Sequence, residues 1–113
     1  MKKLYNQIGL AQKGGMLSSG AMAVKSSLAS GKACLLIMSE DIADNTKENL
    51  INLCRTLQKP FIIFGNKYDL GHAAGKSYRV AATIDNEGIA QAVLGGYKAM
   101  EEERSREVDI WPK

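Results

Sequence analysis

Hydrophobic residues along this chain follow two patterns that alternate. Some runs are apolar almost throughout and have the length of a strand, at residues 34–38, 60–64 and 80–84. Other segments carry an apolar residue at every third or fourth position, as one face of a helix does, at residues 4–11, 24–28, 50–57 and 89–97. The alternation predicts strands that are separated by helices.

Residues that begin or end helices divide these segments further. Glycines close three of the predicted helices, at Gly14–Gly15, Gly31 and Gly75. Polar residues suited to cap a helix N-terminus open three of them, at Ser18–Ser19, Asn45 and Asn66. A short strand is expected at residues 16–18, and a short helix from Lys67 to Gly75.

Strands that are apolar along their whole length are covered on both faces of the sheet. Together with the alternating helices, they predict an α/β fold: a three-layer α/β/α sandwich with a central, mostly buried mixed sheet of about four strands. The 113 residues suit one domain. We expect this domain to span residues 1–100 and a charged C-terminal tail to follow at 101–113. The tail contains the only tryptophan, Trp111. The alternatives for it are a frayed terminus, packing of its ring against the domain, or contact with a partner protein.

Composition excludes several classes of protein. Hydrophobic residues at 45% and charged residues at 24% are typical of a soluble globular domain. No apolar run reaches the about 20 residues that span a bilayer, and the N-terminus turns polar too soon for a signal peptide, so a cytoplasmic protein is expected. Cys34 and Cys54 lie in apolar stretches and are expected to be reduced, buried thiols. With a single histidine, neither a metal site nor a cofactor is expected.

The net charge of +3 hides an uneven distribution. Residues 1–100 carry 12 bases and 7 acids (12 − 7 = +5), whereas residues 101–113 carry 3 bases and 5 acids (3 − 5 = −2). A basic body with an acidic tail favours a nucleic-acid partner.

Two short motifs look like parts of a nucleotide site, but their spacing is wrong. Residues 66–69, Asn-Lys-Tyr-Asp, follow a predicted strand as the guanine-reading element of GTPases does. Residues 71–77 resemble a phosphate-binding loop, yet only three residues separate Gly71 from Gly75 where four are needed, and a strand follows where a helix is needed. His72 has no Ser or Cys partner at catalytic spacing, so we do not expect an enzyme.

Two segments remain as candidates for binding nucleic acid. At Gly20 the start of the second helix is unshielded, so its backbone N–H groups can meet a phosphate, with Lys25 nearby. Before the last strand, Lys76, Tyr78 and Arg79 combine positive charge with an aromatic ring, which suits contact with an RNA backbone and base stacking. The alternatives are an ordinary capped surface helix, and a solvated loop whose tyrosine packs on the core.

Several segments, in their order and spacing, resemble the ribosomal L7Ae/L30e superfamily. They are residues 31–33, 39–46, 67–75 and 80–82. Residues 8–15 and 19–20 resemble its small bacterial YlxQ-type branch more specifically. The resemblance covers about residues 4–97 and implies an α/β/α sandwich that binds RNA, typically at kink-turns.

In that superfamily, the N-terminus of the second helix reads tandem sheared G·A pairs through a Gly-x-Asn-Glu type segment, and the loop before the last strand supports an extruded base. Gly20 matches the glycine, but Met22 and Ala23 stand in place of the asparagine and glutamate. Ser26 takes the place of the usual lysine, and Lys25 lies one position earlier. Better matches are found elsewhere in the predicted site, at Lys67, Arg79, Val80 and Ala81.

Met22 and Ala23 cannot hydrogen-bond to base edges, and each good pair of that kind is worth about 1–3 kcal/mol in DNA recognition. We therefore expect a monomer that binds structured RNA, ribosomal or otherwise kink-turn-like, with weakened base-specific readout and possible association with the ribosome. The expected contacts come from Ser19, Gly20, Met22, Ala23, Lys25, Ser26, Lys67, Lys76, Arg79, Val80 and Ala81. The alternative is a protein–protein interaction module on the same fold with little affinity for RNA.

Overall fold

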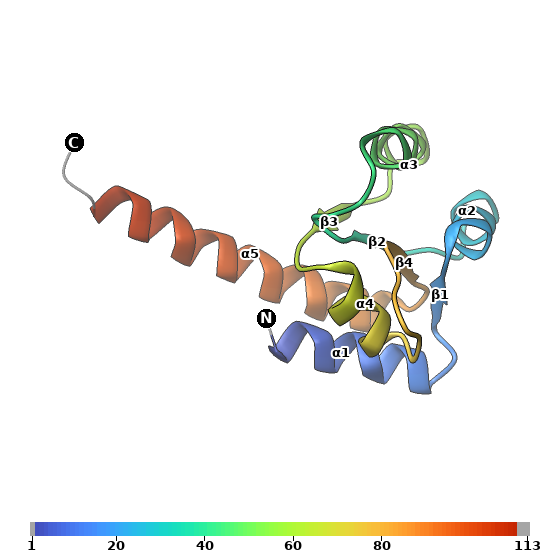
Figure 1. Cartoon of the computed structure of the whole chain (residues 1–113), viewed down its shortest axis with the longest axis horizontal. Helices are drawn as coiled ribbons and strands as arrows, with labels where there is room; N and C mark the ends of the chain where they lie inside the picture. Colours follow the sequence, from blue (N-terminus) through green and yellow to red (C-terminus); the bar gives the residue numbers. More distant parts are fainter. Residues whose placement is uncertain (1, 111–113) are drawn as a thin grey trace.

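The structure is a computed structural model that describes the backbone of residues 2–110 and the side chains of residues 2–103. Trp111 and the last residues of the predicted tail lie outside the described part. The helices are α1 (Lys2–Lys13), α2 (Ala21–Ala29), α3 (Asp44–Leu57), α4 (Lys67–Ala73) and α5 (Glu87–Ile110) (Figure 1). The strands are β1 (Leu17–Ser19), β2 (Leu35–Met38), β3 (Phe61–Ile63) and β4 (Ala81–Ile84).

The strands form one mixed sheet in the order β1-β4-β2-β3. β4 runs antiparallel to both of its neighbours, β1 and β2, whereas β2 and β3 are parallel. Met38, at the end of β2, pairs with Ala81 at the start of β4 and with Ile63 at the end of β3. The predicted mixed sheet of four strands is therefore confirmed.

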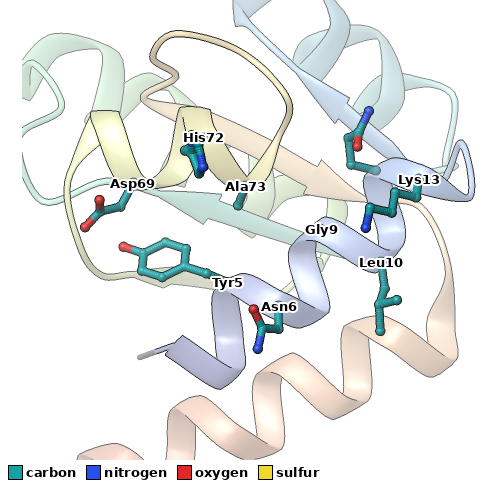
Figure 2. Close-up of a pocket in the computed structure, with 9 residues that line it drawn as sticks. Tyr5, Asn6, Gly9, Leu10, Lys13, Asp69, His72 and Ala73 are labelled. Atoms are coloured by element: carbon teal, nitrogen blue, oxygen red, sulfur yellow. The ribbon is translucent and has the colours of Figure 1, made fainter.

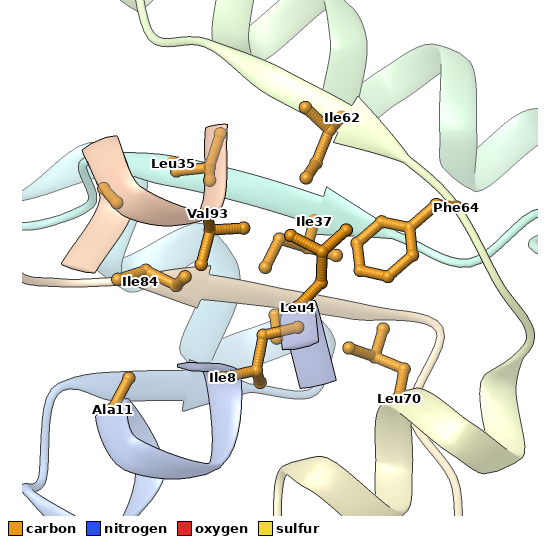
Figure 3. Close-up of a cluster of buried hydrophobic side chains, with 12 residues drawn as sticks. Leu4, Ile8, Ala11, Leu35, Ile37, Ile62, Phe64, Leu70, Ile84 and Val93 are labelled. Atoms are coloured by element: carbon orange, nitrogen blue, oxygen red, sulfur yellow. The ribbon is translucent and has the colours of Figure 1, made fainter. Parts of the chain in front are cut away.

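Side chains of β2 alternate between two hydrophobic clusters, one on each face of the sheet. Leu35 and Ile37 join residues of α1, α4 and α5 in the first cluster (Figure 3). Leu36 and Met38 join residues of α2 and α3 in the second. All four are fully buried, as expected of a strand that is apolar throughout. The helices thus cover both faces, and the α/β/α sandwich is confirmed.

The start of α2 differs from the prediction of a serine cap. Ser18 and Ser19 belong to β1, and the N-cap of α2 is Gly20, where no side chain caps the helix. The Ser18 hydroxyl instead donates a hydrogen bond to Asp85, and the Ser19 hydroxyl accepts one from Arg79. Both serines are held by partners distant in the sequence, which local spacing does not reveal.

The other two predicted caps have different outcomes. α3 begins at Asp44 with Ala43 as N-cap, so the cap predicted at Asn45 is wrong. Asn66 does cap α4, because its side-chain oxygen accepts hydrogen bonds from the backbone N–H groups of Tyr68 and Asp69 at 3.0 and 2.9 Å.

One carboxylate joins three elements beside the sheet. Asp85 follows β4 and accepts hydrogen bonds from the hydroxyls of Ser18 in β1 and Ser27 in α2, both at 2.6 Å, and from Thr83 in β4 at 3.0 Å. Ser27 and Thr83 are buried. Asp85 therefore holds α2 against the β1 edge of the sheet.

α5 continues to Ile110, past the boundary at residue 100 that the charge pattern predicts. In Figure 1 it extends well beyond the body of the protein. The division into a domain and a tail remains a prediction. Within the described residues, no helix is both long and apolar enough to cross a membrane.

Candidate functional site

The N-terminus of α2 lies open at the surface. Gly20 has φ 92° and ψ 155°, a backbone conformation that essentially only glycine adopts. The first turn carries no acidic residue, and Ala21, Met22 and Ala23 are all exposed, Met22 by 87%. The backbone N–H groups of this turn therefore lack a side-chain acceptor and can bind an anion.

The loop before β4 places Arg79 beside this helix start. Its Nε donates to the Ser19 hydroxyl at 3.2 Å and its Nη1 to the carbonyl of Tyr78 at 2.8 Å. A Cβ atom added to Gly20 would lie 3.7 Å from the same Nε. The guanidinium is thus held next to the open N–H groups, with further donors left for a ligand.

Lys67 and two tyrosines form a second part of the same surface. The Lys67 ammonium lies 5.3 Å from the ring centre of Tyr68 and 5.8 Å from that of Tyr78, within the range of cation–π attraction. The two tyrosine residues are 62% and 56% exposed, so Tyr78 is not packed on the core. The backbone N–H of Arg79 donates to the carbonyl of Lys67 at 2.9 Å, which joins this group to the guanidinium.

At the N-terminus of α4, in contrast, backbone N–H groups already have acceptors within the protein. Asn66 caps the helix, and the Lys67 N–H donates to both carboxylate oxygens of Asp41, at 3.0 and 3.3 Å. The nearby Ser39 hydroxyl and the hydrogen bond from this N–H hold the pKa of Asp41 below its usual range. Of these two helix starts, only that of α2 is open to an external anion.

The predicted site residues fall into two groups. Ser19, Gly20, Lys67 and Arg79 are brought together by the contacts above. Others are exposed, and among the described residues no hydrogen bond or ring contact joins their side chains to this group: Met22, Ala23, Lys25, Ser26 and Lys76. Val80 is half-buried, and Ala81, at 3% exposure, lies in the core and supports the loop from within. Sequence reasoning missed Tyr68, which carries no signal beyond the Asn-Lys-Tyr-Asp motif.

Replacing Gly20 with alanine is expected to lower the free energy of unfolding by about 1–3 kcal/mol, the cost of a side chain in a glycine-only conformation. Urea or thermal denaturation measures this effect. Gly95 in α5 has open space around it, so G95A is the matched control and should be neutral or slightly stabilising. Equal stabilities of G20A and G95A would contradict the strain at Gly20.

A groove of about 530 Å³ lies between α1 and α4 (Figure 2). Tyr5, Leu10 and Lys13 line it from α1, and Asp69 and His72 from α4. The Asp69 carboxylate accepts a hydrogen bond from the Asn66 side chain at 3.0 Å, and none joins it to His72. Among the described residues no three His, Cys, Asp or Glu gather to hold a metal.

The thiols offer no activated nucleophile. Cys54 is buried, and burial raises its pKa to about 11. Cys34 is half-buried rather than buried as predicted, and burial raises its pKa too. Both thiols are free and stay protonated near neutral pH, which leaves them weakly reactive.

Comparison with known proteins identifies the family. The profile of the Ribosomal protein L7Ae/L30e/S12e/Gadd45 family matches residues 2–94, which span the sheet and most of the helices. The chain belongs to this family. The predicted L7Ae/L30e relationship is therefore confirmed.

The known proteins to which the chain is similar include the following three. The first is the RNA-binding protein YlxQ of Bacillus subtilis strain 168, 25% identical over 87 residues, which cover 77% of this chain and 87% of YlxQ. A solved structure of a protein with unknown function from Bacillus halodurans is 30% identical, with a TM-score of 0.79, over 82% of this chain and 94% of that one. The 15.5kD RNA binding protein of Giardia lamblia is 25% identical, with a TM-score of 0.73, over 85% of each chain.

Proposed function

We propose that this protein binds structured RNA through the N-terminus of α2 and the loop before β4. The observation that carries the proposal is the uncapped helix start at Gly20, which lies beside the Arg79 guanidinium. Backbone N–H groups at a helix start and a guanidinium both suit phosphate oxygens. Two relatives that are named as RNA-binding proteins support the same partner.

The second part of the surface favours RNA with unpaired bases over a plain duplex. Tyr68 and Tyr78 are both exposed, and the ring centres lie 5.3 and 5.8 Å from the Lys67 ammonium. Exposed aromatic rings stack with bases that are splayed out of a helix, while the cation attracts the backbone. Structured RNA with an extruded nucleotide, in the ribosome or elsewhere in the cytoplasm, meets both requirements, and the role is one of binding rather than catalysis.

Selectivity for kink-turns is expected to be weak in this chain. The positions at which the superfamily places asparagine and glutamate hold Met22 and Ala23, which are exposed and carry no hydrogen-bonding group on their side chains. Contacts to the RNA backbone remain, whereas hydrogen bonds to base edges are lost. Affinity should therefore depend on RNA shape and charge more than on the G·A pairs.

A gel-shift or fluorescence-anisotropy titration tests this expectation. The wild-type protein should bind a kink-turn RNA and its G·A-mutated control with affinities that differ by less than about fivefold, or about 1 kcal/mol. The double variant M22N/A23E should discriminate at least about tenfold, since each restored base-edge contact is worth about 1–3 kcal/mol. Strong discrimination by the wild type would contradict the weakened readout and leave RNA binding itself intact.

The alternative partner is a protein that contacts the same apolar side chains. Met22, Tyr68 and Tyr78, from the proposed RNA-binding segments and α4, are exposed large hydrophobic residues. Salt separates the two functions, because binding to RNA phosphates weakens steeply as the salt concentration rises, whereas an apolar contact does not. Nucleic acid that copurifies at low salt and dissociates at high salt would favour RNA.

A further inference from the structure

We infer that Gly71 is a positioning residue for the RNA-binding surface, because the absence of its side chain lets the loop before β4 lie directly on α4. This inference rests on the proposed function and adds to it the device that sets the position of the binding loop. Gly71 is buried in the middle of α4, where glycine weakens a helix relative to alanine. The reason that this position holds a glycine therefore lies in the packing around Gly71.

The reason is the backbone of Tyr78. A Cβ atom added at Gly71 would lie 2.3 Å from the Cα of Tyr78, 2.6 Å from its carbonyl carbon and 2.7 Å from its nitrogen. These atoms are backbone, so no rotation of a side chain relieves the overlap. With any residue other than glycine, the loop must lift away from α4.

Two backbone hydrogen bonds fasten the loop to α4 on either side of this contact. The N–H of Lys76 donates to the carbonyl of Gly71 at 2.8 Å, and the N–H of Arg79 donates to that of Lys67 at 2.9 Å. Between them Tyr78 crosses Gly71 with its ring exposed and near the Lys67 ammonium. Figure 1 shows this loop running from α4 to β4 on the side of the molecule that holds β1.

The position of the loop also determines where Arg79 lies. The guanidinium reaches the Ser19 hydroxyl at 3.2 Å from a backbone whose preceding residue, Tyr78, rests on α4 at Gly71. Lifting the loop separates both Arg79 from the start of α2 and Tyr78 from Lys67. Gly71 thus acts on the RNA through other residues and does not touch it.

The test compares G71A with G95A. Gly95 is also inside a helix but has no atom within 4 Å of an added Cβ. Both variants are titrated with RNA at a temperature well below their unfolding midpoints. G71A should bind RNA at least tenfold more weakly than the wild type, and its affinity should depend less steeply on salt concentration. G95A should bind RNA like the wild type. Equal affinities of the two variants would overturn the inference.

A second variant covers the case in which G71A does not fold. Insertion of one glycine between Lys76 and Ser77 lengthens the loop and adds nothing at position 71, and it should cause the same loss of affinity. Amide hydrogen exchange provides a readout that needs no RNA: the Arg79 N–H should lose protection in both variants. If the wild type binds no RNA, the proposed function fails while the exchange data still test the placement of the loop. Protection at the wild-type level in both variants would overturn the placement.

Discussion

Replacement of Asp85 by alanine is expected to lower the free energy of unfolding by about 2–4 kcal/mol, since hydrogen bonds to a charged group contribute about 1.5–3 kcal/mol each and are not additive. The carboxylate accepts three hydroxyl hydrogen bonds, and two of the donors, Ser27 and Thr83, are buried. Without it, the buried hydroxyls of Ser27 and Thr83 lose their acceptor. Urea denaturation monitored by circular dichroism measures the change.

Controls separate this effect from the loss of any surface charge. Asp44 is an exposed acid in the first turn of α3, so D44A should destabilise the protein much less than D85A. S27A removes one of the three donors, so its loss of stability should lie between the losses in D44A and D85A. One ordinary hydrogen bond is worth about 1 kcal/mol. If the free energy of unfolding of D85A differs from that of the wild type by no more than this, Asp85 does not hold α2 to the sheet.

Replacement of Arg79 by alanine is expected to weaken RNA binding by about tenfold to 100-fold, which corresponds to about 1–3 kcal/mol. The guanidinium lies beside the open start of α2, so its removal takes away a contact that suits phosphate. The salt dependence should become shallower by the equivalent of about one phosphate contact. Anisotropy titrations at several salt concentrations measure both quantities.

Two further variants test the geometry. R79K keeps the charge but loses the planar fork and the Nε contact with Ser19, so it should recover only part of the affinity. R55A removes an exposed base at the end of α3, just before β3 starts, whereas Arg79 precedes β4 at the opposite end of the sheet. R55A should bind RNA like the wild type. If R55A and R79A weaken binding equally, the partner responds to net charge and not to this surface.

The layers of the fold were predictable because they follow from the hydrophobic pattern. Residues 34–38 contain no polar side chain, which demands cover on both faces of the sheet, and the helices supply that cover. The caps were less predictable: Asn66 caps its own helix locally. The Ser18 hydroxyl instead donates a hydrogen bond to Asp85, which lies 67 residues away in the sequence. Spacing along the chain carries no information about such a partner.

The candidate site was predictable only in part for the same reason. Gly20 and Arg79 were expected on the RNA-binding surface, and the structure places them next to each other. Tyr68 went unrecognised because its role depends on Tyr78 and Lys67 meeting it in space. Ala81 was expected among the RNA contacts, yet it lies in the core at the start of β4. Contacts between residues of different segments depend on how the folded chain brings those segments together.

The start of α2 contains two kinds of residue with different freedom to change. An exchange at Gly20 strains the backbone, and one at Ser19 removes the hydrogen bond that its hydroxyl accepts from Arg79. Met22 and Ala23 are exposed, and neither side chain forms a hydrogen bond. In the proposed mode of RNA binding, new side chains at these two positions alter which RNA is preferred at little cost in folding. The residues proposed to bind phosphate and those proposed to contact the bases can then evolve at separate rates.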